Sequence, residues 1–143
     1  MRKPLCIAAA ILLCGCARHG VVLDGTQGRV IDPHAIRWTE EEKSAVLALA
    51  EIRRGNWNSE HVARLNGAEP LHVHERHDLS VTLLSGRLDV QVGEDWFKMR
   101  PGDVLTVPHG TPHRAVNRAH DPSIAYVVFT PPFDGTDSVE VKP

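Results

Sequence analysis

Residues 102–117 read GDVLTVPHGTPHRAVN, the most informative segment of the chain. It has the pattern G-x5-P-x-G-x2-H-x3-N, set by Gly102, Pro108, Gly110, His113 and Asn117. Turn-forming Gly and Pro residues on both sides of the apolar run 104–107 indicate a short strand that ends in a bend. The bend allows His113 to point inward.

A second histidine-rich stretch lies upstream, where residues 72–78 read HVHERHD. Two histidines separated by one residue, with a third about forty residues later, are spaced like metal ligands that a β-barrel brings together. The sequence therefore predicts a metal pocket formed by His72, His74 and His113. The chemistry done in that pocket stays open.

From Asn56 onward, short apolar segments alternate with Gly, Pro and Asn turns. The predicted strands are 61–65, 71–74, 79–84, 88–92, 96–99, 104–107, 114–116 and 124–129. Seven or eight short strands without a helix between them indicate an antiparallel barrel or double-sheet roll. The polar tail after Phe133 is expected to pack as an edge strand or to trail off.

One helix is predicted ahead of the strands. Thr39 is a good N-cap residue, and Glu42 three positions later completes a capping-box pattern. An apolar stripe follows over 46–52, and Arg53-Arg54-Gly55 suits a helix end. We expect a helix at about 39–54 that covers one end or one face of the barrel.

The N-terminus has the pattern of a targeting segment. A basic start at Arg2 and Lys3 precedes a short apolar run, 5–13, and then Leu13-Cys14-Gly15-Cys16. This stretch resembles the lipobox of bacterial lipoproteins. The resemblance implies that Cys16 carries the lipid and becomes the first residue of the mature protein. Alternatives are an ordinary signal peptide cut after Ala17 and a buried hydrophobic helix.

The lipoprotein interpretation divides the chain into a signal peptide at 1–15, a tether at 16–37 and a folded domain at 38–143. It predicts a lipid-anchored protein of the cell envelope that faces the periplasm or the outer surface. Ala17 is not acidic, which in lipoproteins of this kind favours the outer membrane. All three cysteines lie within the first 16 residues, so we expect no disulfide in the folded domain.

Length and charge limit the number of domains and the kinds of partner that the chain can have. The 143 residues are enough for one domain. The chain has 16 basic and 18 acidic residues and few aromatic ones, so neither a strong positive field nor a base-stacking surface is expected. We therefore expect no nucleic-acid partner.

The two histidine segments resemble the paired motifs of the cupin superfamily, over roughly residues 60–130. The second cupin motif is matched in full by residues 102–117. The first, G-x5-H-x-H-x3-4-E-x6-G, is nearly matched by Gly67, His72, His74 and Gly86. The resemblance implies an all-β fold, a cupin β-barrel in the form of a double-sheet jelly roll, with one divalent metal in its mouth.

The first motif departs from the family at its acidic ligand. Counted back from Gly86, the glutamate position holds Leu79, and Asp78 is one residue out of register. If the register follows Gly86, then Leu79, Val81 and Leu83 line the pocket and Asp78 points away. If a bulge shifts the strand, Asp78 becomes a fourth ligand. The first arrangement is the more ordinary barrel interior and is preferred.

A site of three imidazoles suits Fe(II), Zn(II), Cu(II) or Ni(II) better than Mg(II) or Ca(II). Its uncompensated charge favours an anionic small molecule at the open positions. His77 and His109 are close in sequence and could act as partners of the ligands or as a general base.

Three functions fit these features: a metal-dependent oxygenase, isomerase or lyase, a non-catalytic small-molecule binder that has lost the metal, and a structural barrel. The predicted function is an envelope-tethered cupin with a mononuclear metal site that acts on or binds a small molecule. A homodimer is expected from the resemblance and from exposed strand edges.

Overall fold

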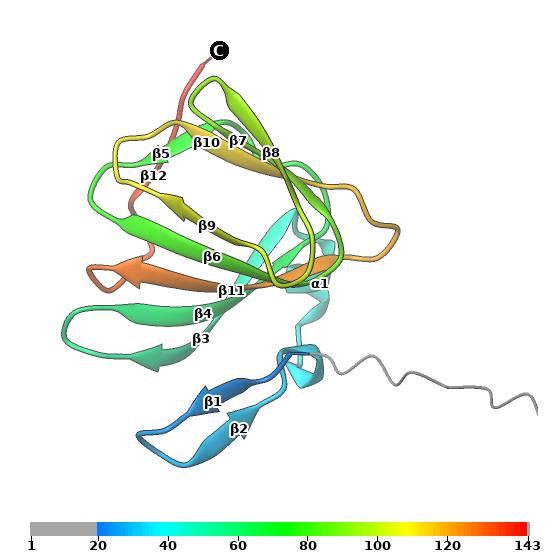
Figure 1. The fold of residues 1–143 in the computed structure, drawn as a ribbon, viewed down its shortest axis with the longest axis vertical. Helices are drawn as coiled ribbons and strands as arrows, with labels where there is room; N and C mark the ends of the chain where they lie inside the picture. Colours follow the sequence, from blue (N-terminus) through cyan, green and yellow to red (C-terminus); the bar gives the residue numbers. More distant parts are fainter. Residues whose placement is uncertain (1–19, 143) are drawn as a thin grey trace, which may run out of the picture.

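The computed structural model describes residues 20–142. Ten strands form two five-stranded antiparallel sheets that face each other and enclose the core (Figure 1). The prediction of an all-β double-sheet barrel is confirmed. The signal peptide and Cys16 lie outside the described residues.

Each sheet is named after one of its strands. The β5 sheet contains, in spatial order, β12 (Ser138–Glu140), β5 (His72–His74), β10 (His113–Asn117), β7 (Leu88–Val92) and β8 (Asp95–Met99). The β11 sheet contains β3 (Leu47–Arg54), β4 (Ser59–Leu65), β11 (Ser123–Thr130), β6 (Asp78–Ser85) and β9 (Val104–Val107). The predicted tail strand is thus β12, which pairs with β5.

Alternation along the strands separates the core from the surface. On β6, Leu79 and Leu83 are buried, and Leu79 pairs with Phe129 of β11 on one side and with Val107 of β9 on the other. Successive side chains of a strand point to opposite faces, so Ser80 lies on the outer face. The buried core contains Ala63, Leu65, Leu79, Leu83, Leu88, Val90, Met99, Val107, Ala125, Val127 and Phe129.

Gly86, the last residue of the first motif, is required by its neighbours. Its φ is +92°, which favours glycine, and it ends β6 beside Ser123. A Cβ at this position would lie 2.1 Å from Oγ and 2.8 Å from Cα of Ser123. The close approach explains why the motif ends in glycine.

The predicted helix is present but much shorter than expected. α1 spans Glu40–Ser44, and its capping box between Thr39 and Glu42 is formed as predicted. The expectation that it continues to about residue 54 is wrong, because residues 47–54 form β3. Pairing of β3 along the whole of β4 supplies backbone hydrogen bonds that outweigh a weak helical preference.

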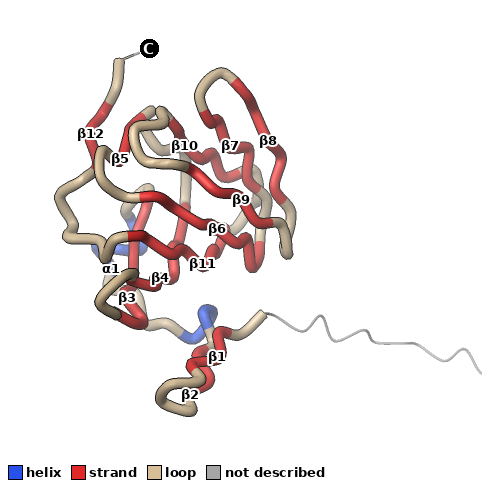
Figure 2. Tube along the Cα trace, turned by 60° about the vertical axis from the view of Figure 1, so that its left-hand side comes forward, coloured by secondary structure: helices blue, strands red, loops and turns tan. Residues whose placement is uncertain are grey.

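The described part of the predicted tether contains a small hairpin of β1 (Val22–Asp24) and β2 (Arg29–Ile31), followed by the 3-10 turn η1 (Pro33–Ala35). The hairpin lies beside the barrel, on the side of β3 and β4 (Figure 2). Arg29 links it to the barrel by donating a 3.3 Å hydrogen bond to the carbonyl of Ile52. Within residues 20–142 no helix is long and apolar enough to span a membrane.

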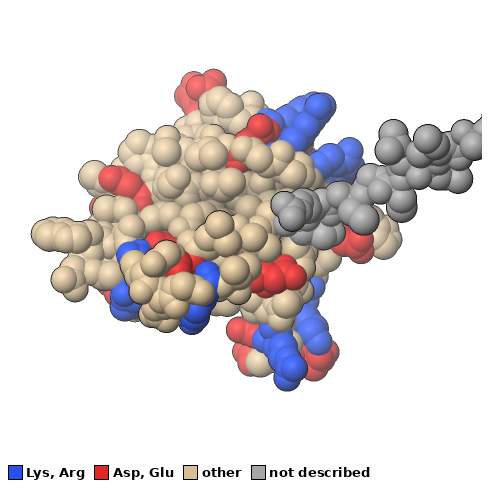
Figure 3. Space-filling model, turned by 60° about the horizontal axis from the view of Figure 1, so that its bottom comes forward, with Lys and Arg blue, Asp and Glu red and all other residues tan. Residues whose placement is uncertain are grey.

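Acidic and basic side chains are interspersed on the face of the molecule that carries this hairpin (Figure 3). Neither sign dominates that face. This distribution agrees with the near balance of charge in the sequence, a formal net charge of −2.

Candidate metal centre

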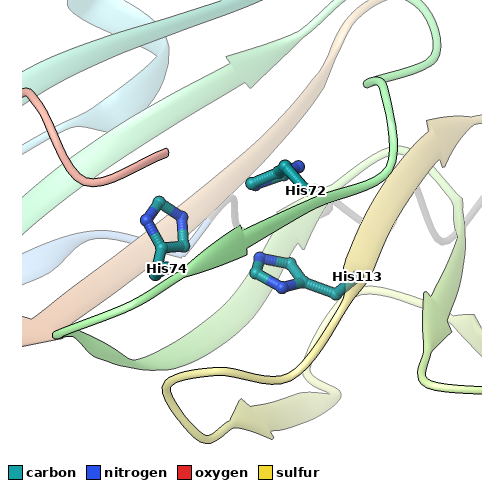
Figure 4. A group of neighbouring side chains, drawn as sticks. All are labelled: His72, His74 and His113. Atoms are coloured by element: carbon teal, nitrogen blue, oxygen red, sulfur yellow. The ribbon is translucent and has the colours of Figure 1, made fainter. Parts of the chain in front are cut away.

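Three predicted ligands converge at one end of the β5 sheet. His72 and His74 lie two residues apart on β5 and therefore share a face, and His113 on β10 pairs directly with His72. Figure 4 shows the three rings clustered together. One ring nitrogen from each lies within 4.8 Å of the others, and all three residues are buried. A metal ion could therefore contact all three.

The loop before β10 holds His113 in position. Gly110 has a φ of +72°, and its N–H donates a 2.7 Å hydrogen bond to the carbonyl of His74. The Pro-Gly bend predicted from the sequence thus ties the His113 loop to the strand that carries the other two histidines.

Backbone carbonyls orient two of the rings. Nδ1 of His72 lies 2.9 Å from the carbonyl of Pro70, and Nδ1 of His113 lies 2.8 Å from the carbonyl of Thr111. Because a carbonyl only accepts, Nδ1 carries the hydrogen in both rings, and Nε2 keeps its lone pair. Metal-ligating histidines are commonly oriented in this way.

His74 has a different partner. Its Nδ1 is the one buried side-chain polar atom without a hydrogen bond among the described residues. It lies 4.0 Å from Oδ2 of Asp137, which also accepts hydrogen bonds from Nδ1 of His77 at 2.5 Å and from the N–H of Arg76 at 3.0 Å. A small movement of the His74 ring toward Asp137 would satisfy this nitrogen.

Burial keeps two of the three rings, those of His74 and His113, neutral. Burial, together with the neighbouring histidines, lowers the pKa of His74 to about 4, and burial lowers the pKa of His113 to about 4 as well. Burial alone would raise the pKa of Asp137, but hydrogen bonds from His77 and Arg76 bring it to about 2. Neutral imidazoles beside an ionised carboxylate are the protonation states that bind a metal.

These observations fit a divalent transition metal. Three histidine nitrogens lie within 4.8 Å of one another, two of the rings are oriented by carbonyls, and the third ring has an unsatisfied nitrogen near a carboxylate. Imidazole donors suit Fe, Zn, Cu and Ni, and three protein ligands leave coordination positions open.

The register of β6 places Leu79, not Asp78, toward the pocket. Leu79 is buried in the core, whereas the side chain of Asp78 is 56% exposed. Asp78 accepts hydrogen bonds from the N–H and from Nδ1 of His109, at 2.8 and 2.7 Å. The preferred register is therefore the one found, and His109 lies with Asp78 on the outside.

A cavity of about 270 Å³ adjoins the histidines. Besides His72, His74 and His113, its polar lining consists of Glu69, Ser123 and Ser138. The rest is apolar and comes from both sheets.

Two acidic residues near the cluster were not expected from the sequence. Asp137 is one. The other is Glu69, whose Oε2 accepts a 2.9 Å hydrogen bond from the N–H of Ala115. Burial raises the pKa of Glu69, although the nearby His72 opposes this. Glu69 precedes the His-x-His pair by three residues, but no motif marks it, and Asp137 is distant in sequence.

Two polar residues of β4 lie outside the histidine cluster. His61 is buried, and its Nε2 lies 2.9 Å from Oγ of Ser59. Arg64 donates a 3.0 Å hydrogen bond to the carbonyl of Lys43 and does not line the cavity.

Comparisons with known proteins agree with this architecture. The family profile described as "Cupin domain" matches residues 62–129. An uncharacterized curated protein of Aquifex aeolicus (strain VF5) is 31% identical over 84 residues, which is 59% of this chain and 69% of the relative.

Two solved structures with a similar fold are at least 25% identical to this chain. A Thermus thermophilus protein has a TM-score of 0.59 and 27% identity, over 70% of this chain and 93% of its own. A Silicibacter pomeroyi DSS-3 protein, described as a sugar phosphate isomerase from a cupin superfamily, has a TM-score of 0.54 and 25% identity, over 62% of each chain.

Proposed function

Because this chain belongs to the cupin superfamily, we propose that it is a metal-dependent cupin. In this proposal His72, His74 and His113 hold one divalent Fe, Zn, Cu or Ni ion, and a small molecule binds at the open positions. The observation that carries the proposal is the convergence of three buried imidazoles, two of which are oriented by backbone carbonyls.

The chain's own residues suggest how such a site would work. A bound metal would supply Lewis acidity, polarising an oxygen of the bound molecule, or a binding position for dioxygen. The carbonyls of Pro70 and Thr111 keep two rings turned toward the site, and the apolar lining excludes water. Glu69, with its raised pKa, is a candidate to exchange a proton with the bound molecule.

Oxygenase, isomerase and lyase activities are all compatible with this arrangement. The second candidate is a non-catalytic small-molecule binder without a metal. Leu79 at the usual glutamate position favours it, because a three-histidine site has one protein ligand fewer than the family motif provides.

Metal content tests the proposal. The purified full-length chain should carry about one transition-metal ion per chain, measured by plasma mass spectrometry. His74→Ala and His113→Ala should abolish binding, because two imidazoles cannot compete with water. The matched control is His109→Ala, an exposed histidine paired with Asp78. Full metal retention in both cluster variants would contradict the assignment.

We further propose that the protein is tethered to the cell envelope through a lipid on Cys16, with the outer membrane favoured. Support comes from the lipobox-like Leu13-Cys14-Gly15-Cys16 and the apolar run before it. Labelled fatty acid should enter the wild type and a Cys6→Ser control but not Cys16→Ser. Absence of label in the wild type would remove this part of the proposal.

A homodimer is also proposed. Edge strands carry unpaired backbone groups, and β8 at the edge of the β5 sheet exposes Trp96 and Phe97. Sedimentation at micromolar concentration should show a dimer, and a monomer alone would exclude it.

A further inference from the structure

We propose that the molecule bound beside the histidine cluster is compact and apolar, with a single oxygen-donor head group, and is not a sugar or a sugar phosphate. The inference rests on the proposed metal centre, because the head group would occupy its open positions. It follows from the chemistry of the cavity lining.

Most of the cavity wall can make only apolar contacts. Of the 24 lining residues, 18 are apolar, and they come from both sheets. On β6 and β11 the inward residues Leu79, Val81 and Val127 face the cavity, together with Phe129. A ligand gains affinity here by burying carbon, about 4-fold for each methylene group.

The few polar side chains are already engaged. Oγ of Ser123 donates a 2.6 Å hydrogen bond to Oδ1 of Asn117 and accepts one from the N–H of Arg87 at 3.1 Å. Oε2 of Glu69 accepts from Ala115, and the three histidines are assigned to the metal. Oε1 of Glu69 and the hydroxyl of Ser138, on the edge strand β12, are the polar groups of the lining that remain for a ligand. Ligand hydroxyls would thus find few partners, and each unpaired one lowers affinity about 10-fold.

The charges of the cavity-lining residues also argue against a sugar phosphate. No Lys or Arg occurs among the cavity-lining residues in the described part of the chain, so a phosphate away from the metal would have no counter-charge. Arg64, on β4, donates a hydrogen bond to the carbonyl of Lys43 and does not line the cavity. Glu69, where ionised, would repel a second anionic group. The lining therefore differs from what a sugar phosphate requires, although the Silicibacter pomeroyi relative is described as a sugar phosphate isomerase.

The test compares ligands that share a head group but differ in their tails. The full-length chain is loaded with Co²⁺, whose visible absorption reports on groups entering its open positions. It is titrated with acetate, butyrate and hexanoate, and separately with glucuronate and ribose 5-phosphate. Affinity should rise at least ~30-fold from acetate to hexanoate, while both sugar ligands should bind no better than acetate.

A matched pair of variants locates the effect. Val127 lines the cavity, and Val128, the next residue on β11, lies on the opposite face of the sheet. Val127→Thr, which introduces a hydroxyl at nearly constant volume, should weaken hexanoate about 5-fold and leave acetate unchanged. Val128→Thr should affect neither, and circular dichroism checks that both variants fold.

The outcomes separate this inference from the proposed function. Equal affinities across the alkyl series, or tighter binding of either sugar ligand than of hexanoate, would overturn the apolar ligand class. If Co²⁺ fails to bind, the metal centre is overturned instead. Calorimetric titration of the metal-free chain with hexanol and ethanol then tests the cavity alone, and equal binding of the two alcohols would overturn the inference.

Discussion

The β5 sheet and the β11 sheet face the same cavity but contribute different chemistry to it. One end of the β5 sheet supplies His72, His74 and His113, all of them buried and close enough to share one metal ion. The inner face of the β11 sheet supplies aliphatic and aromatic side chains such as Leu79 and Val127. The histidine end lowers the stability of the metal-free fold, because burying ionisable groups is unfavourable, whereas the apolar wall stabilises it.

The largest expected effect comes from the apolar side. Leu83 is fully buried on the inner face of β6. Leu83→Ala should lower the free energy of unfolding by about 2–5 kcal/mol, because it leaves a cavity in the core. Urea denaturation measures this, with Ser80→Ala on the outer face as the control, expected within about 0.5 kcal/mol of wild type. Equal losses of unfolding free energy in both variants would contradict the assignment of Leu83 to the inner face and Ser80 to the outer face of β6.

The next effect concerns the histidine end and its response to acid. The folded pKa of His74 and of His113, about 4, lies below the ordinary value of 6.5. As the pH falls, the unfolded chain therefore binds protons before the folded chain does. The stability of the metal-free protein should be fully present above pH 6.5 and decrease by about 2–4 kcal/mol as the pH falls toward the folded pKa.

Denaturation of the metal-free chain at about pH 7 and about pH 5 measures this slope. His113→Asn should remove about half of it, and His120→Ala, whose side chain is almost fully exposed, should leave it unchanged. Identical stability at both pH values in the wild type would show that the histidines are not desolvated.

Asp137 connects the histidine end to the C-terminal segment and should have an intermediate effect. Asp137→Asn removes the carboxylate that accepts from His77 and lies near Nδ1 of His74. Metal affinity should fall about 10-fold, as for other partners of metal-ligating histidines. Asp134→Asn is the control, because Asp134 pairs with Arg76 at the surface. Metal affinity is measured by competition with a chelator. Equal metal affinities of these two variants would contradict a role of Asp137 in metal binding.

The smallest effect is expected at Asp78. Asp78→Asn should leave metal affinity within about 2-fold of wild type, because the carboxylate is exposed and bonded to His109 on the outer face. The same chelator competition measures it. A drop of tenfold or more would restore the alternative register, in which Asp78 is a ligand.

The barrel strands and the histidine cluster were predictable because their signals are local. Gly86 ends β6, and counting back from it correctly places Leu79 inside. Residues 47–54 were wrongly predicted to be helical, because the positions of their Leu and Ala residues fit the helical repeat and the strand alternation almost equally well. Only pairing with β4 decides between the two structures. Asp137 could not be predicted, because its partner Arg76 is 61 residues away and no motif links them.

β12 makes the histidine end depend on the C-terminal strand. His74 pairs with Ser138, and β5 lies between β10 and β12. The β11 sheet uses residues up to 130, whereas the β5 sheet also needs residues 138–140. A chain that ended before β12 would therefore keep all five strands of its apolar wall but would leave β5, which carries two of the three candidate ligands, at the open edge of its sheet.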